Sequence, residues 1–225
     1  MCSSDLCAAI VAAGGLDGFV AKLDADGACV WAKSLGGSGT DRVTALLVDD
    51  AGGVIVSGSY GVTMSFAGDT LPPGPGTFLA KLDESGGETL VRGFQGGTVR
   101  SIAKGNNRIY AAGSYVGTVT NADFTLPNAQ TGGGMVVAYS ATTGAFAWAR
   151  GFPDTSGGAA PLVFRDVATT EGRVALIGSL RGNVAFDGTE LSTGTYDVVF
   201  VELDGADGAV TAADRYGAEI GRAHV

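Results

Sequence analysis

Histidine is almost absent from this chain of 225 residues, since the single one, His224, is next to the last residue. Zinc sites, Ser-His-Asp triads and Cys-His pairs each require at least one imidazole. The body of the chain therefore lacks the commonest catalytic base, and the sequence predicts no catalytic, cofactor-binding or metal-binding residue and no cofactor.

Cysteine is also scarce, with Cys2, Cys7 and Cys29 as the only three. The spacing of Cys7 and Cys29 matches no CxxC metal or redox motif. We expect these two to be small buried apolar residues. A disulfide between them stays open as an alternative.

Positive charge and long apolar runs are lacking too. Lys and Arg number 14 against 23 Asp and Glu, for a formal net charge of −9. This balance argues against nucleic acid as a partner, because binding to phosphates needs clustered basic residues. The longest apolar stretch, residues 7–16, has about half of the roughly 20 residues that a spanning helix requires, so no membrane span is expected in this segment.

The two ends of the chain look like the two strands of one DNA adapter. Residues 219–225 can be encoded by GAG ATC GGA AGA GCA CAC GTC, and the reverse complement of all but the last codon encodes residues 1–6, with GTG as the start codon. We therefore expect residues 1–6 and 219–225 to be adapter-derived and residues 7–218 to be the native segment. On this interpretation His224 and Cys2 do not belong to the protein.

What the chain does have is apolar residues, glycine and an internal repeat. It is 45% hydrophobic, contains 38 glycines and is only 16% charged, a composition that can bury a core. The segment FVAKLDADG at 19–27 returns as FLAKLDESG at 78–86 and VVAYSATTG at 136–144, and, with one extra turn residue, at 199–208. A second marker, Gly-Ser-Tyr or Gly-Ser-Leu, begins at Gly58, Gly113 and Gly178. Two independent markers thus share a period near 60 residues.

Each period can be divided into four or five short strands. Phe19, Ala21 and Leu23 alternate with Val20, Lys22 and Asp24, as in a strand with one face more polar than the other. Asp and Gly form expected hairpin turns at 24–27 and 49–53, and other turn residues replace them at 104–107 and 170–172. We predict an all-β fold, a β-propeller fragment of three to four blades of antiparallel strands that forms an open arc. The expected blade-like repeats are 19–76, 78–134 and 136–196, with a partial one at 197–218.

The order of these motifs resembles the SBBP family, a bacterial β-propeller repeat. The resemblance covers nearly all of residues 14–210 and is carried by AKLD at 21–24, GGSGTDRV at 36–43, LLVDDAGGVIVSGSY at 46–60 and FAGDTL at 66–71. The third copy departs from it, because Tyr139, Ser140 and Ala141 replace Lys-Leu-Asp. That copy, from Ala138 through Trp148, is closer to quinoprotein-like propellers. The resemblance implies an exported bacterial protein, extracellular, at the cell surface or in the periplasm, whose repeats act as a scaffold.

Two groups of residues could instead bind a ligand. Carboxylates crowd into the turns and could hold calcium, but too few of them share one loop, so we expect them to bond to local backbone. They are Asp24, Asp26, Asp49, Asp50, Asp204 and Asp207. Trp31 and Trp148 could form a sugar-stacking platform. Leu90 and Ala212 fill the same repeat position, which favours packing between sheets.

Two further features are given structural interpretations. The run at 132–134 resembles no phosphate-binding loop, and we interpret it as a flexible loop between strands. Lys22 and Lys81 are interpreted as solvated or sheet-edge charges.

The sequence favours a non-enzymatic scaffold or binding module over an enzyme. Its expected partners are a protein or glycan ligand, contacted by loops at one rim, and the remaining blades of the same chain. The alternative is part of a quinoprotein-like or hydrolytic propeller enzyme, with a site that lies mostly in missing blades. Terminal blades without a polar cap would expose apolar sheet surface.

Overall fold

The computed structural model describes residues 7, 10–155 and 162–217, and these residues form strands and turns with no helix. The chain divides into two compact units, Met1–Gln95 and Gly96–Val225, which are described separately below. All strand pairs in both units are antiparallel. The predicted all-β class with antiparallel sheets is confirmed.

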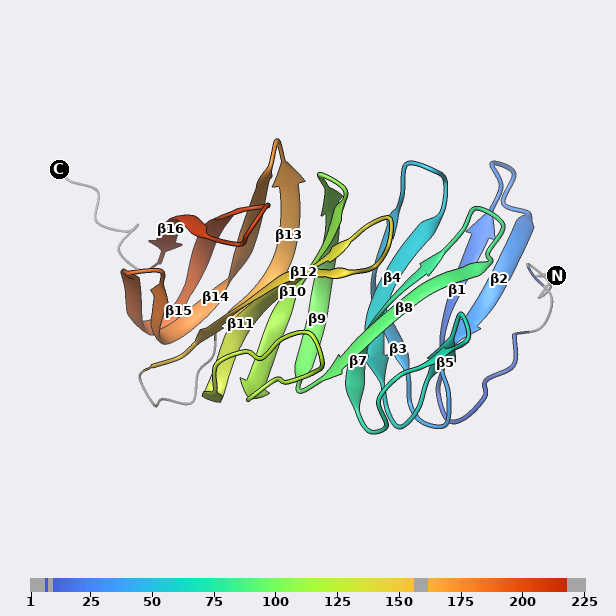
Figure 1. Ribbon diagram of the computed structural model, residues 1–225, viewed down its shortest axis with the longest axis horizontal. Helices are drawn as coiled ribbons and strands as arrows, with labels where there is room; N and C mark the ends of the chain where they lie inside the picture. The colour runs from blue at the N-terminus through green and yellow to red at the C-terminus, as the bar shows by residue number, and fades with distance from the viewer. Residues whose placement is uncertain (1–6, 8–9, 156–161, 218–225) are drawn as a thin grey trace. The chain divides into compact units, whose positions relative to one another are not determined.

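The first unit contains a two-stranded sheet, here called the half-sheet, and one four-stranded sheet, the first sheet (Figure 1). The half-sheet pairs β1 (Gly18–Leu23) with β2 (Cys29–Leu35). The first sheet has the order β3 (Arg42–Val48), β4 (Val54–Tyr60), β7 (Gly76–Leu82), β8 (Glu88–Gln95). A small hairpin of β5 (Ser65–Phe66) and β6 (Asp69–Thr70) lies between β4 and β7 in the sequence.

The second unit contains two four-stranded sheets, which form one hydrophobic core together. The second sheet consists of β9 (Gly97–Gly105), β10 (Arg108–Gly117), β11 (Ala129–Ser140) and β12 (Phe146–Pro153). The third sheet consists of β13 (Val163–Thr170), β14 (Arg173–Phe186), β15 (Thr189–Asp204) and β16 (Val210–Tyr216). Every neighbour in these sheets is consecutive in sequence, the up-and-down order of a propeller blade.

The sheets and the predicted repeats share a period but differ in phase. The repeat that begins at residue 19 starts with β1 and β2, which form the half-sheet, and continues into β3 and β4 of the first sheet. Each predicted repeat therefore spans parts of two sheets. The segment 197–218, expected to open a fourth blade, contains the end of β15 and all of β16, and so completes the third sheet.

The turn before the last strand of each of these four sheets explains the first repeat marker. The turn glycines Gly27, Gly86, Gly144 and Gly208 all have positive φ, from 66° to 81°. Such a φ is readily adopted by glycine and costs other residues conformational energy. The sequence thus placed these glycines correctly at matching turns.

The third copy has a longer turn than its sequence alignment assumed. The closing hydrogen bond runs from Asp24 N to Ala28 O and from Asp83 N to Gly87 O, but from Ser140 N to Ala145 O, one residue further. Ser140 therefore takes the place of the aspartate, and Tyr139 that of the leucine. The sequence alignment of this copy was therefore wrong by one position, because the turn contains one inserted residue. Lys-Leu-Asp is replaced by Ala138-Tyr139-Ser140 and not by Tyr139-Ser140-Ala141.

The second repeat marker, the glycine of Gly-Ser-Tyr, lies beside a β-bulge in each of the three four-stranded sheets. The pairing register shifts next to Gly58, Gly113 and Gly178, where the first strand of the sheet has one extra residue. A Cβ on Gly113 would lie 1.9 Å from the carbonyl oxygen of Thr98, and one on Gly58 equally close to that of Arg42. The bulge brings the two backbones so close that a side chain does not fit.

Each unit buries apolar side chains between consecutive sheets. In each unit the earlier sheet packs on the later one. We call the packed face of the earlier sheet its far face and the packed face of the later sheet its near face, and the opposite faces take the opposite names. In the first unit, Val20 and Leu35 of the half-sheet cluster with Phe78, Ala80 and Leu82 of the first sheet. In the second unit, far-face residues of the second sheet cluster with near-face residues of the third, including Phe164, Leu176, Val199, Val201 and Leu203.

Candidate functional site

Trp148 joins the second sheet to the third. Its side chain is buried, and its indole N–H donates to the carbonyl oxygen of Gly205, in the turn between β15 and β16, at 3.1 Å. The ring lies against Gly208, where a Cβ would come within 2.7 Å of it. The ring of Tyr110 packs against the indole at a tilt, with ring centroids 5.8 Å apart, and its hydroxyl donates to the same carbonyl. The packing role predicted for Trp148 is confirmed.

Trp31 makes the same joint in the first unit. It is half-buried, its indole N–H donates to the carbonyl oxygen of Glu84 at 3.0 Å, and its ring lies against Gly86. Glu84 and Gly205 are both the second residue of their turns, so the two joints are equivalent in the repeat. Both indoles are engaged with the following sheet instead of forming a sugar-stacking platform.

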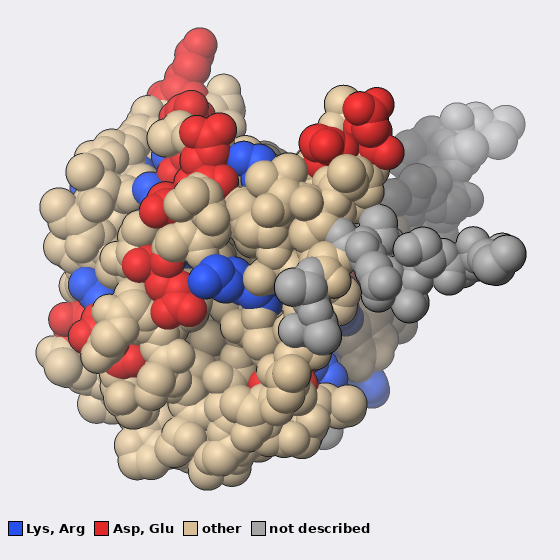
Figure 2. All heavy atoms as spheres, turned by 90° about the vertical axis from the view of Figure 1, so that its right-hand side faces the viewer, with Lys and Arg blue, Asp and Glu red and all other residues tan. Residues whose placement is uncertain are grey.

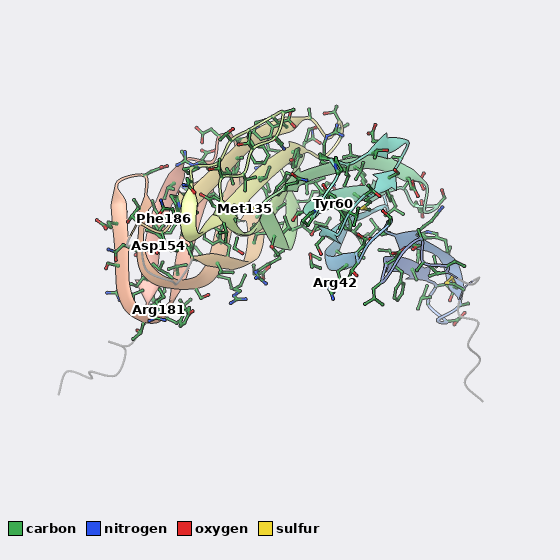
Figure 3. All side chains as sticks on the ribbon, turned by 90° about the horizontal axis from the view of Figure 1, so that it is seen from below. Arg42, Tyr60, Met135, Asp154, Arg181 and Phe186 are labelled. Atoms are coloured by element: carbon green, nitrogen blue, oxygen red, sulfur yellow. A yellow bond between two sulfur atoms is a disulfide. The ribbon has the colours of Figure 1, made fainter. Side chains whose placement is uncertain are left out.

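Buried aspartates make a second type of contact between sheets. Each lies in the loop that connects one sheet to the next and accepts hydrogen bonds from backbone amides. Asp41, between β2 and β3, is 2% exposed and accepts hydrogen bonds from Gly37 N and Gly61 N. Asp154, between β12 and β13, accepts from Asn183 N of the third sheet (Figure 3). Sequence reasoning missed both joints. Asp41 lies in the GGSGTDRV motif, which was a usable signal, but no motif surrounds Asp154.

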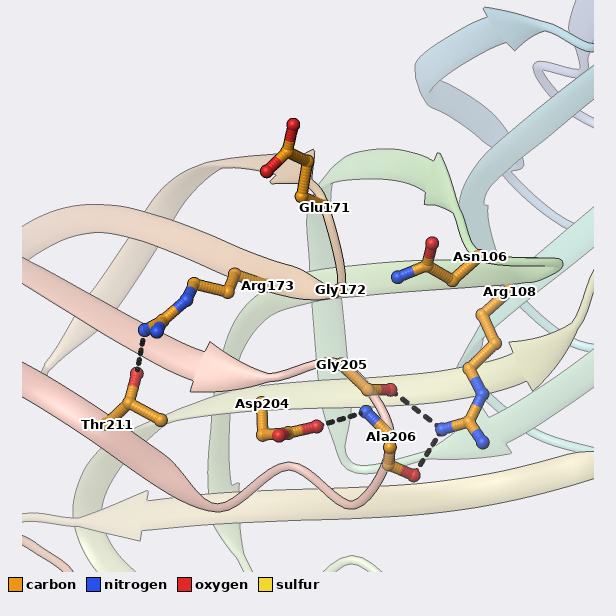
Figure 4. A pocket seen from close by; sticks show the side chains of 9 residues that line it. All are labelled: Asn106, Arg108, Glu171, Gly172, Arg173, Asp204, Gly205, Ala206 and Thr211. Atoms are coloured by element: carbon orange, nitrogen blue, oxygen red, sulfur yellow. Dashed lines mark hydrogen bonds between the residues drawn. The ribbon is translucent and has the colours of Figure 1, made fainter.

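A polar pocket of about 500 Å³ opens at the turns of the second unit (Figure 4). Three turns contribute to it, between β9 and β10, between β13 and β14, and between β15 and β16. The lining residues are Asn106, Arg108, Glu171, Gly172, Arg173, Asp204, Gly205, Ala206 and Thr211. The sequence identified several of these residues only as turn formers.

The pocket contains side chains of both signs. The guanidinium of Arg108 donates to the carbonyl oxygens of Gly205 and Ala206, which fixes it at one wall. Arg173 is paired with Glu202 and donates to Thr211. In the part of the chain that the structure describes, the side chains of Asn106 and Glu171 have no hydrogen-bond partner. The pocket can therefore offer an amide and a carboxylate to a polar ligand.

The turn aspartates that could have held calcium shape the turns instead. Asp24 Oδ1 accepts hydrogen bonds from Asp26 N and Ala28 N, and Asp49 Oδ1 accepts from Ala51 N and Gly53 N. Asp204 and Asp207 accept in the same way from amides two residues further along. The local-backbone interpretation is confirmed for these four. Among the described residues, no group of three or more His, Cys, Asp or Glu is placed to hold a metal ion.

On the face of the molecule seen in Figure 2, Asp and Glu side chains lie on projecting parts of the surface, with Lys and Arg between them.

The interpretation as a solvated or sheet-edge charge was wrong for Lys81, whereas Lys22 lies in the edge strand β1 with a partly exposed side chain, as expected. Lys81 Nζ lies 2.7 Å from Oδ2 of Asp49, whose side chain is only 3% exposed. Lys22 donates to the carbonyl oxygen of Glu84, beside the Trp31 joint. Both lysines lie in strands next to turns that offer acceptors, and the sequence pattern alone does not reveal that proximity.

The Lys81 pair makes stability depend on pH. The hydrogen bond from Lys81 holds the pKa of Asp49 below its ordinary value, against the opposing effect of burial. A carboxylate with a lowered pKa stabilises the fold above its unfolded pKa, and this contribution is lost as pH falls through the folded pKa.

We therefore expect Asp49→Asn to lower the free energy of unfolding by about 1 to 2 kcal/mol at neutral pH. It should also flatten the loss of stability below about pH 4, as measured by urea unfolding at a series of pH values. Asp50→Asn, in the same turn, is the control. If Asp49→Asn and wild type lose stability in parallel on acidification, the ion pair is not the cause.

Cys7 and Cys29 form a disulfide, with Cα atoms 5.1 Å apart. The expectation of two buried free thiols is therefore wrong, and the alternative left open is the one found. The spacing could not decide this, because the approach of residue 7 to β2 depends on the path of the chain between them.

Reduction of the disulfide should loosen the half-sheet. Closing a loop of this sequence separation, 22 residues, restricts the unfolded chain by about 3 kcal/mol in the chain-entropy treatment. We expect Cys29→Ser, or dithiothreitol, to speed hydrogen exchange of residues 18–35 while the exchange of residues 97–153 is unchanged. Unchanged exchange in the half-sheet would show that the bond constrains little.

The glycines at 132–134 belong to β11 and not to a flexible loop. Gly133 pairs with Tyr115 on one side and with Pro153 on the other, and Gly134 pairs with Ser114 and Phe152. A Cβ on Gly134 would lie 2.7 Å from the side chains of Leu162 and Phe164. The glycines therefore allow the third sheet to approach, and the sequence reasoning failed because glycine is usually unfavourable within a strand.

The fold and its joints define an all-β repeat protein in which four-stranded antiparallel sheets recur along the chain. No helix in the described residues is long and apolar enough to cross a membrane. No family model and no curated protein matches the chain. Among solved structures it is similar to BamB from Moraxella catarrhalis, with 15% identity over 92% of this chain and 74% of that one, and a TM-score of 0.35.

Proposed function

We propose that the chain is a non-enzymatic scaffold or binding module of an exported bacterial protein, built as a stretch of SBBP-type β-propeller blades. The observation that carries this proposal is the repeated joint. Trp31 and Trp148 hold the same repeat position, and each donates its indole N–H to a turn carbonyl of the following sheet. Residues that recur with the period thus hold sheet against sheet, which is what a scaffold of stacked blades requires.

Export is supported by the Cys7–Cys29 disulfide. Structural disulfides form and persist in oxidising compartments such as the periplasm and the cell exterior, and are rare in reducing cytosol.

The ligand of this module is a protein or glycan segment rich in hydrogen-bonding groups, bound at the polar pocket of the second unit. Asn106 and Glu171 line that pocket without partners of their own among the described residues. The rigid sheets hold their turns in place, so a ligand meets side chains that are already positioned.

An array of glycans and peptides probed with the full chain tests the binding role. The double variant Asn106→Gly with Glu171→Gly should lose the signal. Glycine suits both positions, where φ is 50° and 38°, so the fold should be retained. Glu190→Gln, an exposed residue outside the pocket, is the matched control.

Two results would contradict the proposal in different ways. An equal signal from the double variant would place the binding site elsewhere. Turnover of any arrayed substrate by the full chain would contradict the non-enzymatic role.

A further inference from the structure

The far face of the third sheet carries exposed apolar side chains. Ile177, Val198 and Tyr216 lie on this face and are 47%, 55% and 53% exposed. Counted from the bulge glycines, the positions of Ile177 and Tyr216 correspond to Ala112 and Phe152 of the second sheet. Those two residues are 0% and 2% exposed, because the third sheet covers them. The second unit thus contains two equivalent far faces. That of the second sheet is covered by the third sheet, and that of the third sheet is exposed.

The near face of the half-sheet is open as well, and its residues match a face that does pack. Phe19, Ala21 and Leu23 correspond to Phe78, Ala80 and Leu82 of the first sheet, residue for residue. The latter three are fully buried against the far face of the half-sheet. Phe19 and Leu23, in contrast, are 63% and 48% exposed. The chain therefore presents a second, unused copy of a near face that is known to fit a far face.

The near face is also hollowed. A cavity of about 300 Å³ opens beside Phe19 and is lined by Ile10, Ala12, Asp17, Gly18, Phe19 and Ser34. A hollow in a mostly apolar face suits a side chain that protrudes from the facing sheet, as the exposed tyrosines of the third sheet do.

Polar groups at the ends of the two faces are complementary. Arg108, the first residue of β10, donates to turn carbonyls of the following sheet, at Gly205 and Ala206. Arg173 is the first residue of β14, its side chain is 55% exposed, and it is turned back onto Glu202 of its own sheet. The turn between β1 and β2 has Ala25 at the position that Glu84 and Gly205 hold in their turns. Arg173 and the turn carbonyl of Ala25 thus hold the same repeat positions as Arg108 and the carbonyl of Gly205, which are hydrogen-bonded within the second unit.

We propose that a second copy of this chain docks head to tail, with the near face of its half-sheet on the far face of the third sheet. Arg173 then donates to the turn between β1 and β2 of the second copy. The two faces differ, so the contact is heterologous, and each added copy presents a free face of each kind. The second copy is the occupant because this chain itself carries both halves of the contact, and the contact continues the stacking already made inside each unit.

The experiment compares full-length variants by sedimentation velocity over a wide range of concentration. Phe19→Asp blocks the near face, and Ile177→Asp blocks the far face. Both residues are exposed, so both variants should fold, which circular dichroism checks. Val116→Asp changes an equally exposed apolar residue away from both faces and is the control.

Wild type and Val116→Asp should gain mass with concentration, and Phe19→Asp and Ile177→Asp should each remain monomeric. An equimolar mixture of these two variants should form a dimer and nothing larger, because one retains the far face and the other the near face. Arg173→Ala should weaken association about tenfold, through loss of a charge-assisted hydrogen bond.

Three results would overturn the proposal. The first is wild type that stays monomeric at every concentration, which would leave the far face to a different sheet. The second is association that survives either blocking variant. The third is a mixture that stays monomeric while wild type associates, which would mean that the near face of one copy does not bind the far face of another.

Discussion

Gly113→Ala is expected to destabilise the second unit by about 3 kcal/mol or more. The new Cβ would lie 1.9 Å from the carbonyl oxygen of Thr98 and 3.0 Å from its carbonyl carbon. Both are backbone atoms, so no rotamer change can relieve the clash and the paired strands must separate. Urea unfolding, followed by circular dichroism, measures the loss.

Gly194→Ala is the matched control in the same unit. No atom lies within 4 Å of its Cβ position, so this substitution should change stability by less than about 0.5 kcal/mol. Comparable losses for the two variants would indicate a general cost of replacing strand glycines, and the bulge explanation would then fail.

Trp148→Ala should cost about 3 to 5 kcal/mol, the usual range for removing a buried tryptophan. The substitution takes away the ring that lies against Gly208 and Tyr110, as well as the hydrogen bond to Gly205. We expect faster hydrogen exchange in the turn between β15 and β16, because this turn is held to the second sheet through the indole.

Trp148→Phe separates packing from hydrogen bonding. The carbonyl of Gly205 keeps Tyr110 and Arg108 as donors, so it is not left unsatisfied, and the loss should be only about 1 to 2 kcal/mol. A Trp148→Ala variant that costs less than about 1 kcal/mol would show that the indole is not a joint between the sheets.

Local features of this fold were predictable from the sequence. Gly27, Gly86 and Gly208 mark turns because few other residues adopt positive φ without strain. Alternation along Phe19, Ala21 and Leu23 indicated a strand, and these residues do form β1, although Val20 on the opposite face is the residue that is buried. The period was visible because the same turns and bulges recur.

Features that depend on which segments meet were not predictable. The phase of the sheets depends on pairing between β2 and β1 and between β8 and β7, and a periodic sequence is consistent with any starting point. The extra turn residue before Gly144 could not be recognised by aligning the repeats, because the preceding strand matches the apolar pattern equally well when it is shifted by one residue. The Cys7–Cys29 bond, the Lys81 ion pair and the Asp154 joint are all contacts between distant segments without a local signature.

The offset between sequence repeat and sheet bears on how such a gene can change in length. A segment from Gly27 to Gly86 runs from one turn to the equivalent turn of the next sheet. Duplication of that segment by recombination would join β7 to a second copy of β2, in place of its equivalent β8, so each affected four-stranded sheet would still have four strands in register. The tryptophan of β2 and the turn carbonyl that receives it would move with the exchanged segment. The number of sheets can therefore change in one genetic step without leaving a strand unpaired.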